Sequence, residues 1–464
     1  MPNYNVRRAF AAGVFACFVT FLLTDPLKRS PIAHLPFEPV QHDAPPRMWP
    51  PIIDLTEKLT YAQRRYEGEG FGPESLAWDL EGRGPYAGLS DGRVVRRNAD
   101  DTAWETFAWA SPQRTPELCD LKPVELEEGK SPIVYGVNMT LVPNLTTEHI
   151  CGRPLGLRFH PVTGELFFAD AYFGVFKVGR QGGLAQPVVT RVDGRPLLFA
   201  NDLDIAASDE NGTLYFTDTS KRFHRRNFFV AIMEGWSDGR LMKVDLATGE
   251  VQVLLRNLAF ANGVALSKDK SFLVVCETTK ARCMRYWIKG PKAGTTQLFL
   301  DLPGLPDNVR LNPRGRFWVA LHAKRGIVID TLATRPWLRR ILMRLPLEVK
   351  ILYAMIVGAP HGYLIEVDEN GEITEVLEDS LGLVVRAISE VEERNGQLWM
   401  GSVIMPHLHV LDYPVKVKLP GKFGQEGGEG EAEGGAVGGK NEDAEGDADG
   451  DADGDAGAGG RDEL

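Results

Sequence analysis

A short pattern recurs six times along the chain, between residues 74 and 393. Each copy has a leading residue, alternating apolar positions, a turn with Gly or polar residues, and then a second apolar and aromatic run. The leading positions are Glu74, Leu155, Asn201, Asn262, Asp307 and Ser389. Short strands repeated at roughly 45 residues, with some longer gaps, are typical of the four-stranded blades of a β-propeller.

The second run of each repeat favours the same architecture. It follows a Gly or polar turn and alternates like a half-buried strand, as in Gly212-Thr-Leu-Tyr-Phe-Thr-Asp and Gly315-Arg-Phe-Trp-Val-Ala-Leu. We therefore predict an all-β fold, a six-bladed β-propeller over residues 68–413 whose last blade closes on the first. A chain of 464 residues with 43% hydrophobic content can supply a core of this size.

The leading positions also predict a metal site. In a propeller the first position of each innermost strand faces the central channel, and four of these positions are Glu74, Asn201, Asn262 and Asp307. Two carboxylates and two amide carbonyls form a set of hard oxygen ligands that suits Ca²⁺. Such an ion either stabilises the fold or acts as a Lewis acid, with Asp307 as base or nucleophile and Asn308 adding an oxygen.

The two ends of the chain predict where in the cell the protein resides. Residues 1–8 carry Arg7-Arg8 and read as a cytosolic end, and residues 9–24 form an apolar run that is either a signal anchor or a cleaved signal peptide. Residues 25–67 are Pro-rich and are interpreted as a linker. Residues 414–464 are rich in Gly and acidic residues, which predicts a disordered tail with a side possibility of weak calcium binding.

The C-terminal residues Arg461, Asp462, Glu463 and Leu464 resemble a luminal retrieval signal, which implies a retrieval receptor as partner. Together the ends predict residence in the lumen of the endoplasmic reticulum as a single-pass type II membrane protein. Three sequons, at Asn138, Asn144 and Asn211, would be usable there. The net charge of −11 argues against nucleic acid as a partner.

The five cysteines fit an oxidising compartment. Cys119 and Cys151 flank a loop-rich stretch and are predicted to form a disulfide. Cys276 and Cys283 face each other across a predicted hairpin, where they are either a second disulfide or two small buried residues. Cys17 lies in the apolar run and is predicted to be unpaired.

One insertion breaks the β pattern. Residues 334–357 predict two short helices with basic and apolar faces. They are either a lid over the channel mouth that also touches the membrane, or a helical insertion packed on the rim of the propeller.

Longer motifs make the resemblance to a known family specific. They are Gly72-Pro-Glu-Ser-Leu-Ala-Trp, Cys151-Gly-Arg-Pro-Leu-Gly-Leu-Arg-Phe, Phe199-Ala-Asn-Asp-Leu-Asp, Tyr215-Phe-Thr-Asp-Thr-Ser and Leu305-Pro-Asp-Asn-Val-Arg. With these the chain resembles the strictosidine synthase-like family, in its branch typified by adipocyte plasma membrane-associated protein. That family is similar to the paraoxonases and to calcium-dependent lactonases of the regucalcin type.

The resemblance implies a six-bladed propeller and calcium ligands at Glu74, Asn201, Asn262, Asp307 and Asn308. Two positions depart from the relatives. Ser389 stands where strictosidine synthase has its catalytic Glu, and Leu155 stands where paraoxonases have a channel His. His322 and His224 are the candidates to replace that His as a base.

The expected function is therefore calcium-dependent hydrolysis of small lipophilic esters or lactones, of arylesterase type, with Asp307 and Asn308 as catalytic candidates. A binding or scaffold propeller without catalysis is the alternative. A condensing enzyme of the strictosidine synthase type is a further alternative, and it is disfavoured because Ser389 cannot deprotonate an amine.

Overall fold

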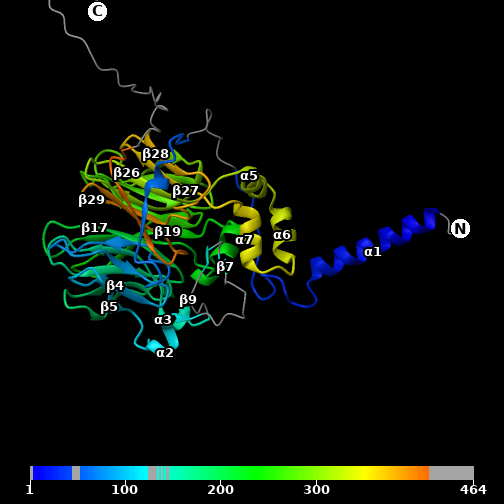
Figure 1. Cartoon of the computed structure of the whole chain (residues 1–464), viewed down its shortest axis with the longest axis horizontal. Helices are drawn as coiled ribbons and strands as arrows, with labels where there is room; N and C mark the ends of the chain where they lie inside the picture. The colour runs from blue at the N-terminus through cyan, green and yellow to red at the C-terminus, as the bar shows by residue number, and fades with distance from the viewer. Residues whose placement is uncertain are drawn as a thin grey trace, which may run out of the picture. The chain divides into compact units, whose positions relative to one another are not determined.

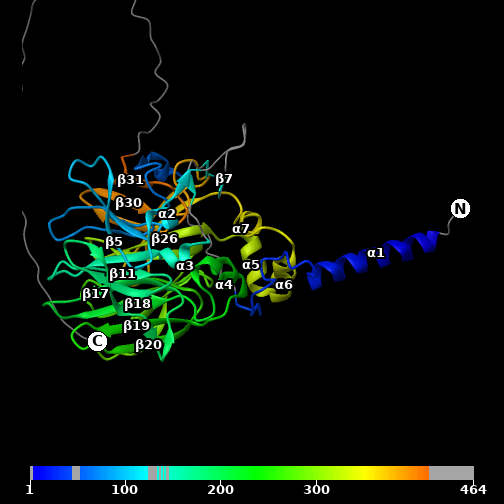
Figure 2. The same cartoon turned by 90° about the horizontal axis from the view of Figure 1, so that it is seen from below.

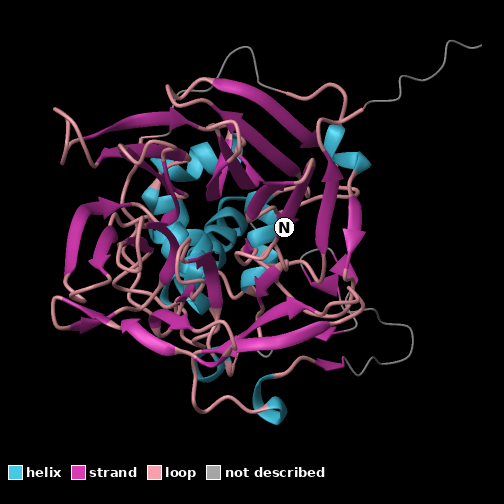
Figure 3. Cartoon of the chain, turned by 90° about the vertical axis from the view of Figure 1, so that its left-hand side faces the viewer, coloured by secondary structure: helices cyan, strands magenta, loops and turns pink. Residues whose placement is uncertain are grey.

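A computed structural model describes residues 4–43, 53–123, 133–134, 137–138, 141–142 and 146–416. Six antiparallel sheets follow one another along the chain, and each has its first strand innermost. Figure 3 looks along the axis of the resulting ring, with the blades around it and helices over its centre. The predicted six-bladed β-propeller is confirmed.

The blades are numbered in chain order. Blades 1 and 2 consist of β2 (Leu76–Ala77), β3 (Tyr86–Gly88), β4 (Arg93–Arg97) and β5 (Trp104–Trp109), then β10 (Pro154–Phe159), β11 (Leu166–Asp170), β12 (Gly174–Val178) and β14 (Gln186–Val189). Blades 3 and 4 consist of β17 (Ala200–Ala206), β18 (Thr213–Asp218), β19 (Gly239–Asp245) and β20 (Val251–Leu258), then β21 (Ala261–Leu266), β22 (Phe272–Glu277), β23 (Arg282–Trp287) and β24 (Thr296–Asp301). Blades 5 and 6 consist of β25 (Gly304–Leu311), β26 (Phe317–Lys324), β27 (Gly362–Val367) and β28 (Ile373–Asp379), then β29 (Glu390–Arg394), β30 (Gln397–Gly401), β31 (Leu408–Asp412) and β1 (Gln63–Arg65).

Short elements connect or extend the blades. The short strands are β13 (Gly183–Leu184), which pairs in parallel with β5, and the pairs β6 (Lys122–Pro123) with β9 (Leu141–Val142), β7 (Ile133–Val134) with β8 (Val137–Asn138), and β15 (Arg191–Val192) with β16 (Arg195–Pro196). The short helices are η1 (Lys58–Tyr61), α2 (Pro116–Cys119), α3 (Glu148–Cys151), η2 (Arg225–Asn227) and α4 (Phe228–Glu234).

The core lies between neighbouring blades. Every residue of β22 is buried, because both faces of this blade meet another blade. Val274, Phe317 and Tyr363, from blades 4 and 5, belong to one such apolar cluster. The predicted second strands are β11, β18, β22, β26 and β30, each placed as the alternating sequences indicate.

The ring closes through a strand from the segment that was interpreted as a linker. β1 pairs antiparallel with β31 in blade 6, with Gln63 opposite Val410. Leu59 in η1 is fully buried, and the backbone N–H of Asp54 donates to Glu378 at 3.0 Å. The linker interpretation of residues 25–67 is therefore wrong for residues 54–65, which belong to the propeller.

Three helices inserted between β26 and β27 replace the two that were predicted. They are α5 (Ile327–Thr334), α6 (Pro336–Arg344) and α7 (Val349–Val357), and together we call them the cap. The insertion starts seven residues earlier than predicted, since α5 begins at Ile327 and the predicted range began at Thr334. Figures 1 and 2 show the three helices side by side at one end of the propeller.

The cap is packed on the propeller by apolar contacts. Met343 and Leu352 are fully buried in a cluster with Phe229 of α4 and Ile32 of the N-terminal segment. This burial explains why helices of eight or nine residues are ordered, since isolated helices of that length are marginal in water.

The N-terminal segment contains one helix, and several of the predicted targeting and glycosylation features lie outside the described residues. Helix α1 covers Tyr4–Thr24. Over the part of the chain with described structure, no helix combines the length and hydropathy that crossing a membrane requires. The sequon at Asn144, the acidic tail and the retrieval signal lie outside the described residues. Asn138 belongs to β8, and Asn211 is exposed.

Two disulfides are present. The predicted Cys119–Cys151 pair is confirmed, with an S–S distance of 2.05 Å. Cys276 and Cys283 are directly opposite in β22 and β23 and also form a disulfide, which settles the alternative left open by the sequence. Cys17 is free and exposed.

Candidate metal centre and ligand pocket

The innermost strands have the same irregularity in four blades. Their pairing with the second strand shifts register after Pro154, Ala200, Ala261 and Pro306. The residues that fall within these shifts include Leu155, Asn201, Asn262 and Asp307. Because a β-bulge re-aims a side chain, the bulges account for the way these positions face the channel.

Glycines allow the inner strands to approach one another at this level. A Cβ atom on Gly263 would lie 2.5 Å from the Cα of Asn308, and one on Gly156 would lie 2.7 Å from the Cα of Asp202. No side chain fits at such distances, so each Gly that follows a leading position is required by the neighbouring blade.

Threonines orient the two amides of the cage. The Nδ2 of Asn201 donates to Thr219 Oγ1 at 3.0 Å, and that hydroxyl donates to the carbonyl of Ala261 at 2.7 Å. In the next blade, Asn262 Nδ2 donates to Thr278 Oγ1 at 2.9 Å. These hydrogen bonds use the NH₂ groups and leave each Oδ1 as the end that faces away from the threonine.

Several buried oxygens at this level lack a hydrogen-bond donor. They are Glu74 Oε2, Asn201 Oδ1, Asn262 Oδ1 and Asn308 Oδ1, each without a partner among the described residues. Leaving one such acceptor unpaired is costly, and four of them in one channel need a common positive partner. The predicted ligands therefore fit an oxygen-ligated divalent cation. We call Glu74, Asn201, Asn262, Asp307 and Asn308 the cage.

The charges of the cage lead to the same requirement. Burial raises the pKa of Glu74, and the nearby Asp307 carboxylate raises it further. Burial also raises the pKa of Asp307. One cation approaches Glu74, since Arg153 Nη2 lies 3.8 Å from its Oε2. Among the described residues, no group of three or more His, Cys, Asp or Glu side chains is placed to hold a metal ion, so a cation at this site would need the amide oxygens.

A cavity of about 550 Å³ opens directly on the cage. Glu74, Asn201, Asn262 and Asp307 line it, so the structure brings all four predicted metal ligands to one place. Asn308, predicted as catalytic, is not among the lining residues; its Nδ2 donates to Glu390 at 3.2 Å. Its position suits a ligand below the cavity better than a group that touches a substrate.

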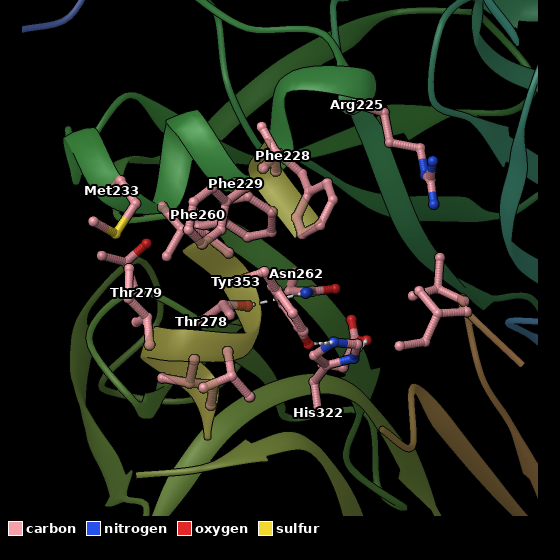
Figure 4. Close-up of a pocket in the computed structure, with 18 of the residues that line it drawn as sticks. Arg225, Phe228, Phe229, Met233, Phe260, Asn262, Thr278, Thr279, His322 and Tyr353 are labelled. Atoms are coloured by element: carbon pink, nitrogen blue, oxygen red, sulfur yellow. Dashed lines mark hydrogen bonds and ion pairs between the residues drawn. The ribbon is translucent and has the colours of Figure 1, made fainter. Parts of the chain in front are cut away.

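The cavity walls are mostly apolar and come from the helices. Phe228, Phe229 and Met233 of α4 form one side, as Figure 4 shows, and Leu332 and Tyr353 of the cap form another. Arg225 also lines the cavity, and its Nη1 donates to Glu148 at 2.6 Å. A pocket of this size with few polar groups at its base is typical of a small-molecule site.

The structure separates the two candidate histidines. His322 lines the cavity, and its Nδ1 lies 3.7 Å from Asp307 Oδ2. Its Nε2 is 2.7 Å from the hydroxyl of Tyr353, a residue that the sequence did not single out (Figure 4). Burial lowers the pKa of His322 to about 4, so the ring is neutral near pH 7. His224 is stacked on Tyr172 and is not among the residues that line the cavity.

Ser389 is fully buried beside the cage. Its hydroxyl accepts from the backbone N–H of Val403 at 3.0 Å, and its side chain also bonds Asp307. The adjacent Glu390 accepts hydrogen bonds from Leu76 N–H and Arg310. Among the described residues that line the cavity, blade 6 therefore supplies no carboxylate, which keeps the condensation reaction disfavoured.

The cavity and cage can be compared with known proteins. A family model described as strictosidine synthase matches residues 201–291, and one described as strictosidine synthase-like, N-terminal, matches residues 57–97. Protein strictosidine synthase-like 3 of Arabidopsis thaliana is 44% identical over 406 residues, covering 87% of this chain and 98% of that protein.

Human adipocyte plasma membrane-associated protein is 33% identical over 426 residues, covering 88% of this chain and 92% of its own length. Among solved structures, a gluconolactonase from Xanthomonas campestris has a TM-score of 0.48 at 15% identity, over 81% of this chain and 97% of that one. With its motifs, its propeller and relatives that match over nearly their whole length, the chain belongs to the strictosidine synthase-like family.

Proposed function

We propose that this chain is a calcium-dependent hydrolase of lipophilic esters or lactones. The observation that carries the proposal is the set of buried, unpaired oxygens at the base of an apolar cavity, with a neutral histidine beside Asp307. When bound, Ca²⁺ would polarise the carbonyl of the substrate and stabilise the negative charge that develops on its oxygen.

The substrate class follows from the walls of the cavity. Phe228, Phe229 and Leu332 offer apolar surface to an acyl chain or aryl ring, while the polar groups of the cage lie at one end. A ligand is thereby oriented with its carbonyl toward Asn201, Asn262 and Asp307. Apolar walls around a few polar groups favour small lipophilic substrates over charged ones.

His322 is the residue that would accept a proton from the attacking water. When its Nε2–H donates to the Tyr353 hydroxyl, Nδ1 carries the free lone pair and faces the cage. Its lowered pKa leaves this lone pair unprotonated at neutral pH. Because a base of such low pKa is weak, the attacking water would also have to be acidified by the bound cation. Tyr353 acts as a positioning residue because its hydroxyl holds the orientation of the ring and can accept the Nε2–H of this tautomer.

The first test is hydrolysis of phenyl acetate and of a lipophilic lactone by the full chain, before and after chelation. We expect chelation to abolish turnover and added Ca²⁺ to restore it. His322→Gln is expected to lower kcat/KM by about 10²-fold, the usual contribution of a general base. The matched control is His224→Gln, which should leave kcat/KM within about twofold, because His224 does not line the cavity.

Two results would contradict the proposal. Undiminished hydrolysis in excess chelator would show that the cage has no part in the reaction. Tight calcium binding without turnover of any ester or lactone would leave the ion structural and favour a binding propeller.

We also propose that the protein resides in the lumen of the endoplasmic reticulum, anchored as a type II membrane protein and recognised by a retrieval receptor. Two disulfides and an exposed sequon at Asn211 support an oxidising, glycosylating compartment. Asn211→Gln is expected to remove one endoglycosidase-sensitive step of electrophoretic mobility. A wild-type chain expressed in eukaryotic cells whose mobility no endoglycosidase changes would contradict this location.

A further inference from the structure

The outer surface of the cap is unusually apolar for this molecule. Six of the 19 large apolar residues that are exposed in the described chain lie within residues 327–357. They include Ile327 at 70%, Trp337 at 61% and Met355 at 57% exposure, together with Ile341 and Ile351. These five residues we call the outer face of the cap. Such a concentration marks an interaction site, whereas single exposed apolar residues need no explanation.

The same helices are apolar on their inner side. Leu332 of α5 and Tyr353 of α7 line the ligand cavity, while Ile327 and Met355 of the same helices point to solvent. A helix that is apolar all round is normally covered on every side. The propeller and the N-terminal segment with Ile32 cover the buried side of the cap and leave the outer face exposed. The outer face therefore has the composition of a surface that another apolar surface covers.

The charged residues of the cap indicate what covers its outer face. The acidic residues of the cap are already paired, Asp330 with Arg325 at 2.6 Å and Glu348 with Lys350 at 2.7 Å. Arg335 and Arg340 are exposed and form no ion pair with any residue that has described structure. Although the whole chain has a net charge of −11, this face is therefore locally cationic.

We propose that the outer face of the cap docks on the surface of an anionic lipid bilayer. Apolar side chains next to arginines are the composition of helices that lie in the membrane interface, where Trp337 would sit at the headgroup level. Docking to a second copy of the chain is disfavoured because it would bring the arginines of two caps together. The proposal is independent of the hydrolase activity and rests on the outer face alone.

Docking has a consequence for the cavity. Since α5 and α7 separate the outer face from the cavity by a single layer of helix, a docked cap holds the apolar walls of the cavity next to lipid. Lipophilic molecules dissolved in the bilayer would then reach the cavity without crossing bulk water.

The test places an environment-sensitive nitrobenzoxadiazole label on the full chain. Cys17→Ser removes the one free cysteine found in the described residues, and Met355→Cys then provides a labelling site on the outer face. The matched control is Val162→Cys, at 45% exposure in the turn between β10 and β11. That turn lies at the opposite end of the blades, because the cap follows the end of a second strand.

With vesicles of phosphatidylcholine containing about a third phosphatidylserine, we expect a blue shift and a several-fold rise in emission from the label at 355 and no change at 162. Combining Arg335→Glu and Arg340→Glu should raise the lipid concentration needed for this change by about tenfold. The label is a local readout, so vesicle binding by any other segment does not imitate the result.

Three outcomes would overturn the proposal. One is an unchanged label at 355 on chains that float with the vesicles. Another is an equal response with pure phosphatidylcholine, which would remove the role of anionic lipid. The third is a blue shift that grows with protein concentration in the absence of vesicles, which would assign the outer face to a second copy of the chain.

Discussion

Asp307→Asn is expected to stabilise the calcium-free protein at pH 8 and yet to lower kcat/KM for ester hydrolysis by about 10³-fold. The substitution keeps the shape of the side chain and removes one of the two carboxylates of the cage. The gain in melting temperature that calcium gives to the wild type should be lost together with activity. A variant that merely misfolds cannot show this combination.

The sign of the stability effect follows from the raised pKa values. Burial raises the pKa of Glu74 and of Asp307 above their ordinary range. Without a cation, the folded state therefore holds protons that the unfolded state has lost, and stability falls as the pH rises from about 4 through the raised values. The amide introduced by Asp307→Asn carries no charge, so this loss should be smaller in the variant, most clearly at pH 8.

Melting temperatures between pH 5.5 and 8, with calcium and with chelator, measure both effects. Calcium at about 100 times its dissociation constant stabilises a single-site protein by about 2.7 kcal/mol. At one fixed calcium concentration the wild type should gain more at pH 8 than at pH 5.5, because calcium binds the deprotonated carboxylates. Asp412→Asn, on the exposed end of β31, is the control and should behave as the wild type. Full activity in Asp307→Asn would remove the cage from the mechanism.

The cage could be predicted because its signal is local and repeated. Each leading position stands at or near the start of an inner strand, and four of the six residues carry oxygens that suit Ca²⁺. What the sequence does not contain is the geometry that turns these oxygens toward one another. The register shifts at Ala200, Ala261 and Pro306, and the contacts of Thr219 and Thr278 with the next blade, depend on strands that are far apart in the chain.

The parts that were missed have weak local patterns. β1 reads Gln63-Arg-Arg, and all three residues are exposed, so no alternation distinguishes it from a linker. α5 begins directly after a strand, without a capping side chain that would mark its start. His322 and His224 are equivalent as sequence features, and only the fold places one of them 3.7 Å from Asp307. Tyr353 can be recognised as part of the site only in the structure, because its hydroxyl lies 2.7 Å from Nε2 of His322.

Arg310→Met is expected to destabilise the propeller by about 3–5 kcal/mol, the usual cost of leaving buried charges without their partner. Arg310 is buried, and its Nη1 and Nη2 donate to Asp202 at 2.6 and 2.8 Å. It also donates to Glu390, which in turn accepts from the N–H of Leu76 in blade 1. One guanidinium thus joins blades 3, 5 and 6, and it reaches blade 1 both through Glu390 and through a hydrogen bond of 3.4 Å from Nη2 to Ser75 Oγ.

The midpoint of urea unfolding measures this loss of stability, and two further variants test whether unpaired buried charges cause it. Arg316→Met, in the same blade, removes a half-exposed arginine that pairs with Glu366 at 2.9 Å, and should cost less than about 1 kcal/mol. Adding Asp202→Asn and Glu390→Gln to Arg310→Met should recover part of the loss, because neutral amides are cheaper to bury than unpaired carboxylates. Equal costs for Arg310→Met and Arg316→Met would mean that water reaches the centre of the ring, and then the unpaired oxygens of the cage would not require a cation.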